Sequence, residues 1–267
     1  AISQGYKMDN LKVTTLNVRG LRSNDKRISL YNYLQEKSIQ IAFLQETYCT
    51  KEFEKAFNKG WNGKIIHSFS QTSHSKGVCI LLSKDVDFDI INTYKDDSGR
   101  YLLINVNING LVYTLVCVYC PNAENERKSF LKNISEMSLE KMLSCENLIC
   151  AGDFNCVLEA IDKKNGNFSS KCSNHLKKFI HALHLEDSWR FSNGNNKEYT
   201  FVDPSNRGRD SRIDYIFVPK YLTKHIMDCN ILPAPAPDHN AVCLKIRTSN
   251  NPRGPGYWKL NVSILDD

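Results

Sequence analysis

Apolar and polar positions alternate soon after the start of the chain. Residues 12–18 follow this alternation and are rich in β-branched side chains, so they predict a strand. Residues 39–44 form a short apolar run, which predicts a second, buried strand. Between the two, residues 28–34 carry an apolar side chain at every third position. This spacing indicates a helix, which either Asn24 or Asp25 could cap at its start.

The clearest local pattern is a pair of apolar alternating runs joined by two residues. The runs cover residues 101–108 and 111–119, and Asn109-Gly110 separates them. Both central positions of a type I′ turn need a positive φ angle, which Asn and Gly tolerate best. The segment therefore predicts a β-hairpin with a two-residue turn.

The same patterns continue to the C-terminal part of the chain and show no internal repeat. Apolar residues at i, i+3, i+4 and i+7 predict an amphipathic helix at residues 176–183, and a second helix face runs from Phe130 to Ser144. Many strands with about three helices favour two packed sheets flanked by helices. The further strands that we predict are 64–69, 78–83, 148–151, 199–203, 213–218 and 241–247.

No linker divides the chain before residue 248. Residues 1–10 are polar and unpatterned, and we expect a disordered lead or one added by the expression vector. Residues 11–247 then form one domain, of an ordinary size for a single α/β unit. From residue 248 to 267, Pro, Gly and Asn break the pattern. We interpret this stretch as a tether toward a missing downstream region.

Composition and charge narrow the class of protein. Hydrophobic residues make up 41% and charged residues 24%, as in a globular protein, and the net charge of +6 permits a polyanionic partner without requiring one. The longest nearly apolar run, Leu111–Cys120, is far shorter than the roughly 18 residues of a membrane span. We see no secretory signal, so we expect no membrane partner and expect the ten cysteines to be reduced thiols.

Polar residues recur where the predicted strands begin or end. Taken singly, each is a common turn residue or a solvated strand end. Together they provide carboxylates for a hard metal ion, an imidazole with an acidic neighbour, amides and a phenol, which is the set that phosphodiester hydrolysis needs. Oxygen ligands of this kind suit Mg²⁺ better than zinc. The residues concerned are Asn17, Glu46, Tyr119, Asp153, Asn155, Asp214, Asp238 and His239.

These residues belong to seven short motifs whose order resembles that of the exonuclease–endonuclease–phosphatase superfamily. Each motif alone is weak, but the ordered set covers residues 11–247 and is specific. The resemblance implies a four-layer α/β sandwich of two mostly antiparallel sheets with the site at one edge. The motifs are Leu16-Asn-Val-Arg-Gly20, Leu44-Gln-Glu-Thr47, Val118-Tyr-Cys-Pro-Asn122, Gly152-Asp-Phe-Asn155, Tyr199-Thr-Phe201, Ser211-Arg-Ile-Asp-Tyr215 and Pro237-Asp-His239.

The resemblance also implies a role for each matching residue. Glu46 is expected to bind Mg²⁺, or Mn²⁺ in its place, with Asn17 and Asp238 as further ligands. Asp153 is expected to orient or deprotonate the attacking water. The expected phosphate contacts are Asn155, Tyr119 and His239, with His239 oriented by Asp214. The implied products carry a 3′ hydroxyl and a 5′ phosphate.

Two departures from the family pattern point to one branch. Abasic-site repair endonucleases usually carry Asp where this chain has Arg19, and Pro237 replaces the usual Ser before Asp-His. The chain looks most like the endonuclease of LINE-type, non-LTR retrotransposons, and Arg253–Asn261 resembles the string that follows it in those polyproteins. The resemblance implies a nucleus-acting enzyme that nicks double-stranded DNA for target-primed reverse transcription, beside a downstream reverse transcriptase region. Abasic-site repair, a phosphatase or phospholipase, and a non-catalytic DNA-binding descendant remain alternatives.

The segment 206–212 contains three arginines between two predicted strands. It is either a solvated hairpin tip or a DNA-probing loop, since Arg side chains favour phosphates and narrow minor grooves. Related retrotransposon enzymes vary this hairpin, and it influences their choice of target. We predict DNA contacts for Arg207, Arg209, Arg212, Thr200, Arg19 and Lys76.

Overall fold

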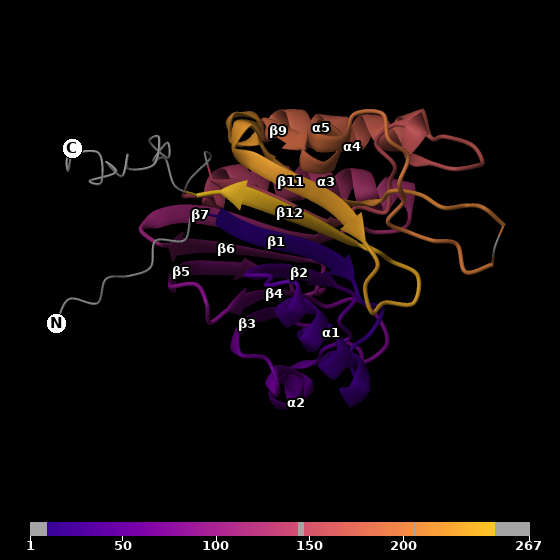
Figure 1. Cartoon of the computed structure of the whole chain (residues 1–267). Helices are drawn as coiled ribbons and strands as arrows, with labels where there is room; N and C mark the ends of the chain where they lie inside the picture. Colours follow the sequence, from indigo (N-terminus) through magenta and orange to yellow (C-terminus); the bar gives the residue numbers. More distant parts are fainter. Residues whose placement is uncertain (1–9, 144–146, 206, 249–267) are drawn as a thin grey trace, which may run out of the picture.

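The computed structural model describes residues 10–143, 147–205 and 207–248, and Figure 1 shows their arrangement. The predicted lead up to residue 9 and the tether from residue 249 lie outside the described residues. Twelve strands form two sheets of six strands each, which confirms the predicted fold class. Most neighbouring strands are antiparallel, and each sheet contains one parallel pair, β1 with β2 and β7 with β8.

The first sheet has the strand order β11-β12-β1-β2-β4-β3. Its central strands are apolar at nearly every position, because they are covered on both faces. The bounds are β1 Asn10–Asn17, β2 Ile41–Gln45, β3 Gly63–Ser68, β4 Val78–Ser83, β11 Ile226–Leu232 and β12 Ala241–Arg247.

The second sheet has the order β5-β6-β7-β8-β10-β9. The predicted hairpin is confirmed: Ile108 pairs with Leu111, and Asn109 and Gly110 have φ angles of 52° and 85°. The bounds are β5 Phe88–Lys95, β6 Tyr101–Ile108, β7 Leu111–Tyr119, β8 Leu148–Asp153, β9 Leu185–Asp187 and β10 Asp214–Pro219.

Helices cover the outer faces of both sheets, which gives four layers (Figure 1). One apolar core lies between the sheets, a second joins α1 and α2 to the first sheet, and a third joins α3 and α4 to the second. The α-helices are α1 Asn24–Glu36, α2 Glu54–Asn58, α3 Glu124–Lys141, α4 Ser170–Ala182 and α5 Ser188–Asn193, and the short 3-10 helices are Lys51–Phe53, Ala160–Asp162 and Lys220–His225.

One predicted strand does not form, three strands were not predicted, and one predicted helix cap was wrong. Residues 199–203 form no strand, because only Phe201 makes isolated bridges, to Ser211 and His239. The strands β5, β9 and β11 were not predicted. The N-cap of α1 is Ser23, not Asn24 or Asp25.

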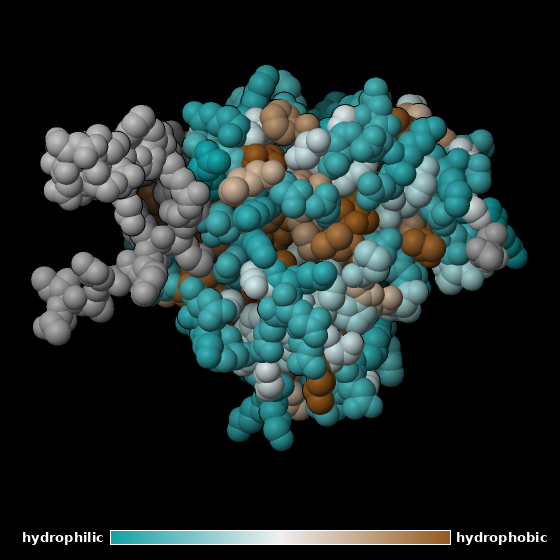
Figure 2. Space-filling view, in the orientation of Figure 1, coloured by the Kyte–Doolittle hydropathy of each residue, from teal (hydrophilic) through white to brown (hydrophobic). Residues whose placement is uncertain are grey.

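The face of the molecule in Figure 2 is largely hydrophilic, with apolar residues in small separate groups. Among the described residues, none of the helices combines the length and the apolar composition needed to cross a membrane.

Candidate active site

The strand ends that carry the predicted residues meet at one edge of the two sheets. Asn17 ends β1 opposite Gln45 of the parallel strand β2, so Glu46 follows immediately beside it. In the second sheet, Asp153 ends β8 with Tyr119 on one side and Asp214 on the other. Parallel neighbours end at the same edge, so topology alone gathers these side chains.

A cleft of about 480 Å³ opens at this edge. Five of the predicted residues line it: the predicted catalytic residues Glu46, Asp153, Asn155 and His239, and the predicted DNA contact Arg19. The predicted residues that share the cleft lie up to 220 positions apart in the sequence (19 to 239).

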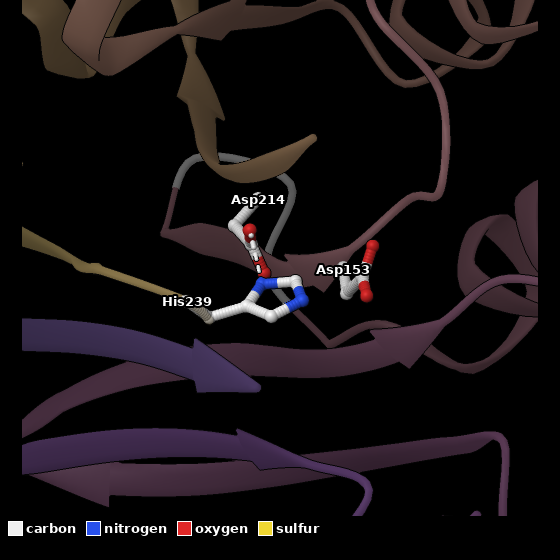
Figure 3. A group of neighbouring side chains, drawn as sticks. All are labelled: Asp153, Asp214 and His239. Carbon is white, nitrogen blue, oxygen red and sulfur yellow. Dashed lines mark hydrogen bonds and ion pairs between the residues drawn. The ribbon is translucent and has the colours of Figure 1, made fainter. Parts of the chain in front are cut away.

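The centre of the site is a buried cluster of two carboxylates and one imidazole. In Figure 3 the His239 ring lies between Asp214 and Asp153, and one ligand atom from each residue lies within 4.8 Å of the others. His239 Nδ1 lies 2.9 Å from Asp214 Oδ2, which fixes the ring. Such a cluster supplies acid and base groups side by side.

The charges in the cluster raise the pKa of both central groups, Asp153 and His239. Burial and the nearby Asp214 carboxylate raise the pKa of Asp153 to about 7. Burial alone would lower the pKa of His239, but the Asp214 carboxylate outweighs burial and raises that pKa to about 9. Near neutral pH the imidazole is therefore a cation, and Asp153 can exchange a proton.

Asn17 joins the cluster to Glu46. Its Nδ2 donates to Glu46 Oε1 and to Asp153 Oδ2, each at 2.9 Å. Its Oδ1, the atom that could bind a cation, accepts the Arg19 backbone N–H at 3.1 Å. In this arrangement Asn17 bridges the two carboxylates.

Tyr48 is a functional candidate that the sequence analysis missed. Its hydroxyl donates to Glu46 Oε2 at 2.7 Å, and Asn17 Nδ2 donates to Oε1, so both carboxylate oxygens of Glu46 are held. Tyr48 lies two positions after Glu46 and one residue beyond the motif Leu44-Gln-Glu-Thr47, so a search confined to the motif did not include it. A carboxylate offers about four lone-pair directions, so Glu46 retains capacity for a hard cation.

The two predicted phosphate donors from β7 and β8 border the same region. Asn155 Nδ2 donates to the Cys120 carbonyl at 2.8 Å, while the Asn155 backbone N–H donates to Asp153 Oδ1 at 2.8 Å. Tyr119 is mostly buried, with the Arg100 guanidinium 5.2 Å from its ring centre. Burial and the Glu46 carboxylate raise the pKa of Tyr119, so its O–H stays protonated as a donor.

Two predicted DNA contacts are corrected by burial. Thr200 is fully buried, and its hydroxyl oxygen accepts the backbone N–H groups of Ile213 (3.0 Å) and Asp214 (3.1 Å). Thr200 therefore positions Asp214 instead of meeting DNA.

Arg212 is the second correction, because its side chain is 1% exposed. It forms ion pairs with Asp162 (2.8 Å) and Asp187 (2.7 Å) and lies against the rings of Trp189 and Tyr215. Arg212 was predicted to lie at the hairpin tip, but it lies two residues before β10, and its side chain is buried. Its role is structural.

The remaining predicted DNA contacts are accessible or partly so. Arg207 and Arg209 are exposed, while Asn206, the predicted start of the hairpin, lies outside the described residues. Lys76 is half-buried in the loop before β4, where its carbonyl accepts the Tyr48 N–H at 3.0 Å. Arg19 is exposed at the cleft.

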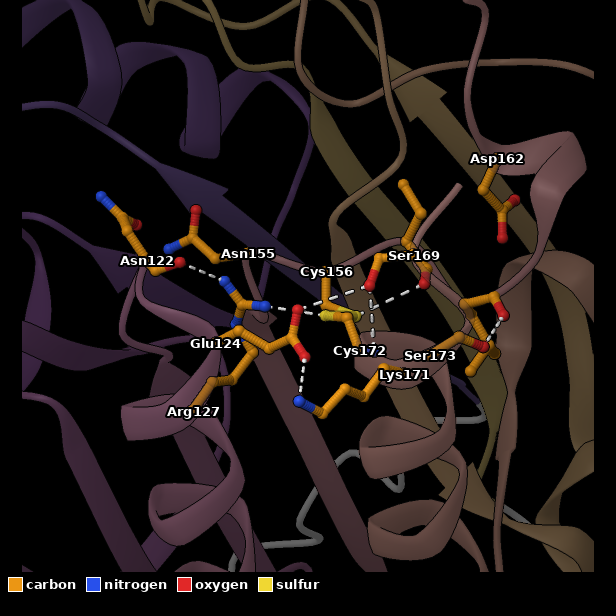
Figure 4. The surroundings of a disulfide bond; sticks show 12 residues. Asn122, Glu124, Arg127, Asn155, Cys156, Asp162, Ser169, Lys171, Cys172 and Ser173 are labelled. Carbon is orange, nitrogen blue, oxygen red and sulfur yellow. Dashed lines mark hydrogen bonds and ion pairs between the residues drawn. A yellow bond between two sulfur atoms is a disulfide. The ribbon is translucent and has the colours of Figure 1, made fainter. Parts of the chain in front are cut away.

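We expected all cysteines to be reduced, but a disulfide in the wall of the cleft shows that this expectation was wrong. Cys156 and Cys172 both line the cleft and are joined by a disulfide, shown with its surroundings in Figure 4. Burial in apolar strands explains free thiols such as Cys79, but Cys156 lies in a loop and Cys172 in the first turn of α4. The two cysteines are 16 positions apart in the sequence, and their Cα atoms lie 6.3 Å apart.

Comparisons with known proteins agree with this architecture. The chain is 31% identical over 262 residues to the "Transposon TX1 uncharacterized 149 kDa protein" of Xenopus laevis, and the match covers 96% of this chain but 20% of that protein. The chain thus spans about a fifth of the length of this relative.

Two solved structures share the fold. An AP endonuclease from Archaeoglobus fulgidus matches with a TM-score of 0.71 at 22% identity, over 90% of this chain and 100% of that one. The endonuclease domain of TRAS1, a telomere-specific non-LTR retrotransposon, matches with a TM-score of 0.67 at 18% identity, over 89% of this chain and 98% of that one.

A family-wide comparison matches residues 14–249, nearly the whole described domain. It confirms the resemblance seen in the seven motifs and the expectation of a phosphodiesterase-type enzyme. By this match the chain belongs to the Endonuclease/Exonuclease/phosphatase family.

Proposed function

We propose that the chain is a divalent-cation-dependent endonuclease that nicks one strand of double-stranded DNA. The observation that carries the proposal is the convergence of Glu46, Asp153 and His239 on one cleft. These side chains supply a cation anchor, a base and an acid, which are the three functions that hydrolysis of a phosphodiester requires.

Asp153 is the group that prepares the attacking water. A general base works best when its pKa lies near the working pH, and the Asp153 pKa of about 7 meets that condition. Asn17 and the Asn155 backbone hold its two oxygens, so the carboxylate has a fixed direction. The water adds to phosphorus, and the bond to the 3′ oxygen breaks, which leaves a 3′ hydroxyl and a 5′ phosphate.

His239 supports the negative charge that develops on the phosphate. Its pKa of about 9 keeps the ring cationic at pH 7 to 8, and the bond to Asp214 aims it. Asn155 and Tyr119 border the same region as further hydrogen-bond donors. Fixed donors of this kind stabilise a transition state because they need no rearrangement during the reaction.

Glu46 fits a bound Mg²⁺ or Mn²⁺. It lies in the cleft, it is held by Asn17 and Tyr48, and oxygen-rich surroundings favour hard cations. Such an ion supplies charge neutralisation for the phosphate oxygens.

The biological setting follows from the relatives. The chain is 31% identical to a transposon protein, and the match covers 96% of this chain. This similarity supports a retrotransposon endonuclease, in which the freed 3′ hydroxyl primes reverse transcription. In this proposal the chain acts in the nucleus beside a downstream reverse transcriptase region. The exposed Arg207 and Arg209 meet the DNA backbone or minor groove.

A nicking assay on supercoiled plasmid tests the proposal. We expect relaxation with Mg²⁺ or Mn²⁺ and none with excess EDTA. Glu46→Gln and Asp153→Asn are each expected to slow nicking at least about 100-fold. Asp89→Asn, an exposed carboxylate change on β5, is the matched control and is expected to keep full activity. Full activity of Glu46→Gln, or activity in EDTA, would contradict the proposal.

The same assay separates the alternative functions. Matched duplexes with and without one abasic site test repair, and a preference of about a thousandfold for the abasic duplex, or about 4 kcal/mol, would favour it. Release of phosphate from small phosphomonoesters without plasmid nicking would favour a phosphatase. Tight DNA binding with no cleavage under any cation would favour a non-catalytic binding protein.

A further inference from the structure

An ion pair at the rim of the cleft engages one of the carboxylates predicted to bind metal. Arg19 Nη1 donates to Asp238 Oδ2, and the Asp238 side chain is 1% exposed. Its other oxygen, Oδ1, is also enclosed by protein. Asp238 does not line the cleft, whereas Arg19 does. A cation in the cleft therefore meets the guanidinium before it can meet this carboxylate.

Arg19 is held in place through its backbone. Its φ angle is 45°, in the left-handed region, and its N–H donates to Asn17 Oδ1 at 3.1 Å. The ammonium group of Lys26 donates to the carbonyls of Val18 (3.4 Å), Arg19 (3.1 Å) and Gly20 (2.9 Å). A non-glycine residue keeps this conformation only where its surroundings specify it. The backbone contacts of the loop after β1 therefore fix the position of Arg19.

The loop that follows β1 is also joined to the loop that carries Glu46. Gly20 N–H donates to the Glu46 carbonyl at 2.7 Å, and the ring of Tyr48 packs so closely on Gly20 that a Cβ there would lie 2.6 Å from it. These contacts couple the position of the Arg19 guanidinium to that of the Glu46 carboxylate.

The other side of the guanidinium is open. The Arg19 side chain is 46% exposed, and its hydrogen bonds within the described chain come from Nη1 alone. An arginine has five N–H donors, so several remain for a ligand in the cleft. A guanidinium anchored by a carboxylate on one edge can bind a phosphate with another.

We propose that Arg19 takes the place of a second cation in this site: it occupies Asp238 and offers its free N–H groups to the substrate phosphate. The chain then holds one divalent ion, on Glu46, and Asp238 is not a ligand. This inference deepens the proposed nuclease function and rests on it for the identity of the phosphate. In this proposal Asp238, which the sequence led us to expect as a metal ligand, pairs with Arg19 instead.

Counting bound Mn²⁺ in the absence of DNA, by electron paramagnetic resonance of the free ion, tests the proposal. The wild-type chain is expected to bind one Mn²⁺ ion. The Glu46→Gln variant is expected to bind this ion at least about tenfold more weakly, because the substitution removes the carboxylate charge that anchors it. Asp238→Asn is expected to leave the affinity within about threefold, because Asp238 contributes no ligand. Two ions on the wild-type chain, or equal losses in the two variants, would overturn the proposal.

Removing Arg19 gives the complementary test. Arg19→Ala is expected to bind a second Mn²⁺, which Arg19→Ala/Asp238→Asn loses again, while Arg19→Lys keeps one ion because it retains the charge. Thermal unfolding verifies that each variant is folded, and Arg19→Gln replaces the alanine variant if that one is not. An unchanged single ion in folded Arg19→Ala would refute the exchange of Arg19 for a cation.

The phosphate contact has its own readout. In cation-free buffer, Arg19→Ala is expected to flatten the dependence of log Kd for duplex DNA on log salt by about one unit, the effect of one lost phosphate contact. An unchanged slope would refute that contact. Ion counting needs no DNA, so a chain that binds one ion as expected yet nicks nothing would contradict the nuclease proposal alone.

Discussion

Replacing Asp214 by asparagine removes one charge from the centre of the site with little change in shape. The carboxylate lies 2.9 Å from His239 Nδ1, and it raises the His239 pKa to about 9 against the opposing effect of burial. Asparagine retains an oxygen that can accept the same N–H. The Asp214→Asn variant therefore tests whether catalysis depends on the charge of the imidazole.

The structure gives the size of the effect. Moving the His239 pKa from 6.5 to about 9 stabilises the protonated ring by about 3 kcal/mol, at about 1.4 kcal/mol per unit. In the wild-type chain at pH 8, roughly nine rings in ten are cationic. Without the Asp214 carboxylate, burial lowers the His239 pKa, while Asp153 and Asp238 still raise it. A return to the ordinary value of about 6.5 leaves about 3% of the rings cationic at pH 8, which corresponds to about 30-fold slower nicking at that pH.

The dependence on pH identifies the cause. His239 has a raised pKa, so in the wild type its contribution is present below about pH 9 and is lost as the pH rises through that value. Asp153 must be deprotonated, so the rate rises through about pH 7. We expect a wild-type optimum between these values. In Asp214→Asn the falling limb moves to lower pH, and the ratio of wild-type to variant rate shrinks as the pH is lowered.

The assay is single-turnover nicking of supercoiled plasmid from pH 5.5 to 9.5 at saturating Mg²⁺, with Asp89→Asn as the surface control. Thermal unfolding is the check that Asp214→Asn is folded. A rate ratio that stays the same across the pH range would refute the role assigned to the imidazole charge. A variant as active as the wild type at pH 8 would do the same.

Three further predictions concern residues around the site. Arg212→Met removes the cation that the buried Asp162 and Asp187 share, and Asp162 keeps its ion pair with Arg190. We expect the free energy of unfolding to fall by about 3–5 kcal/mol and, at about 2 °C per kcal/mol, Tm to fall by about 6–10 °C; calorimetry showing no more change than Arg209→Ala would contradict this. Arg207→Ala/Arg209→Ala is expected to flatten the salt dependence of DNA binding by up to about two units and to shift the nick sites, with Lys84→Ala as control; an unchanged slope and nick map would return the segment to a solvated tip. Tyr48→Phe removes the donor to Glu46 and is expected to weaken Mn²⁺ binding about tenfold or more, and calorimetric titration giving the wild-type affinity would exclude this role.

Most of the fold could be predicted because its strongest patterns are local. The Asn109-Gly110 turn and the apolar alternation on each side specify the hairpin without any information from elsewhere in the chain. The strands that escaped prediction have weaker patterns. β5 and β11 lie at sheet edges with one side partly exposed, so polar residues interrupt their apolar positions. Edge position is a property of the assembled sheet, which a local window does not contain.

Site chemistry could be predicted from strand ends, but side-chain partners could not. Asn17 and Asp153 end recognisable strands and Glu46 follows one directly, and in each sheet a parallel pair brings two such strand ends to the same edge. The partner of Arg19 lies 219 positions away, and the two partners of Arg212 lie 50 and 25 positions away (212 to 162 and 212 to 187). Such pairs form only after the sheets have packed, so sequence motifs gave the groups present without showing which are engaged with each other.

The arginines at this edge show how burial divides one residue type among three tasks. Arg212 is enclosed by two carboxylates and two aromatic rings, and an ion pair so buried is costly to break, so it holds the base of the hairpin. Arg19 is anchored on one edge and open on the other, which suits a phosphate in the cleft. Arg207 and Arg209 are exposed beyond both, where they can follow the DNA backbone. A count of positive charges treats these four side chains alike, whereas their carboxylate partners determine which of them remain available to the nucleic acid.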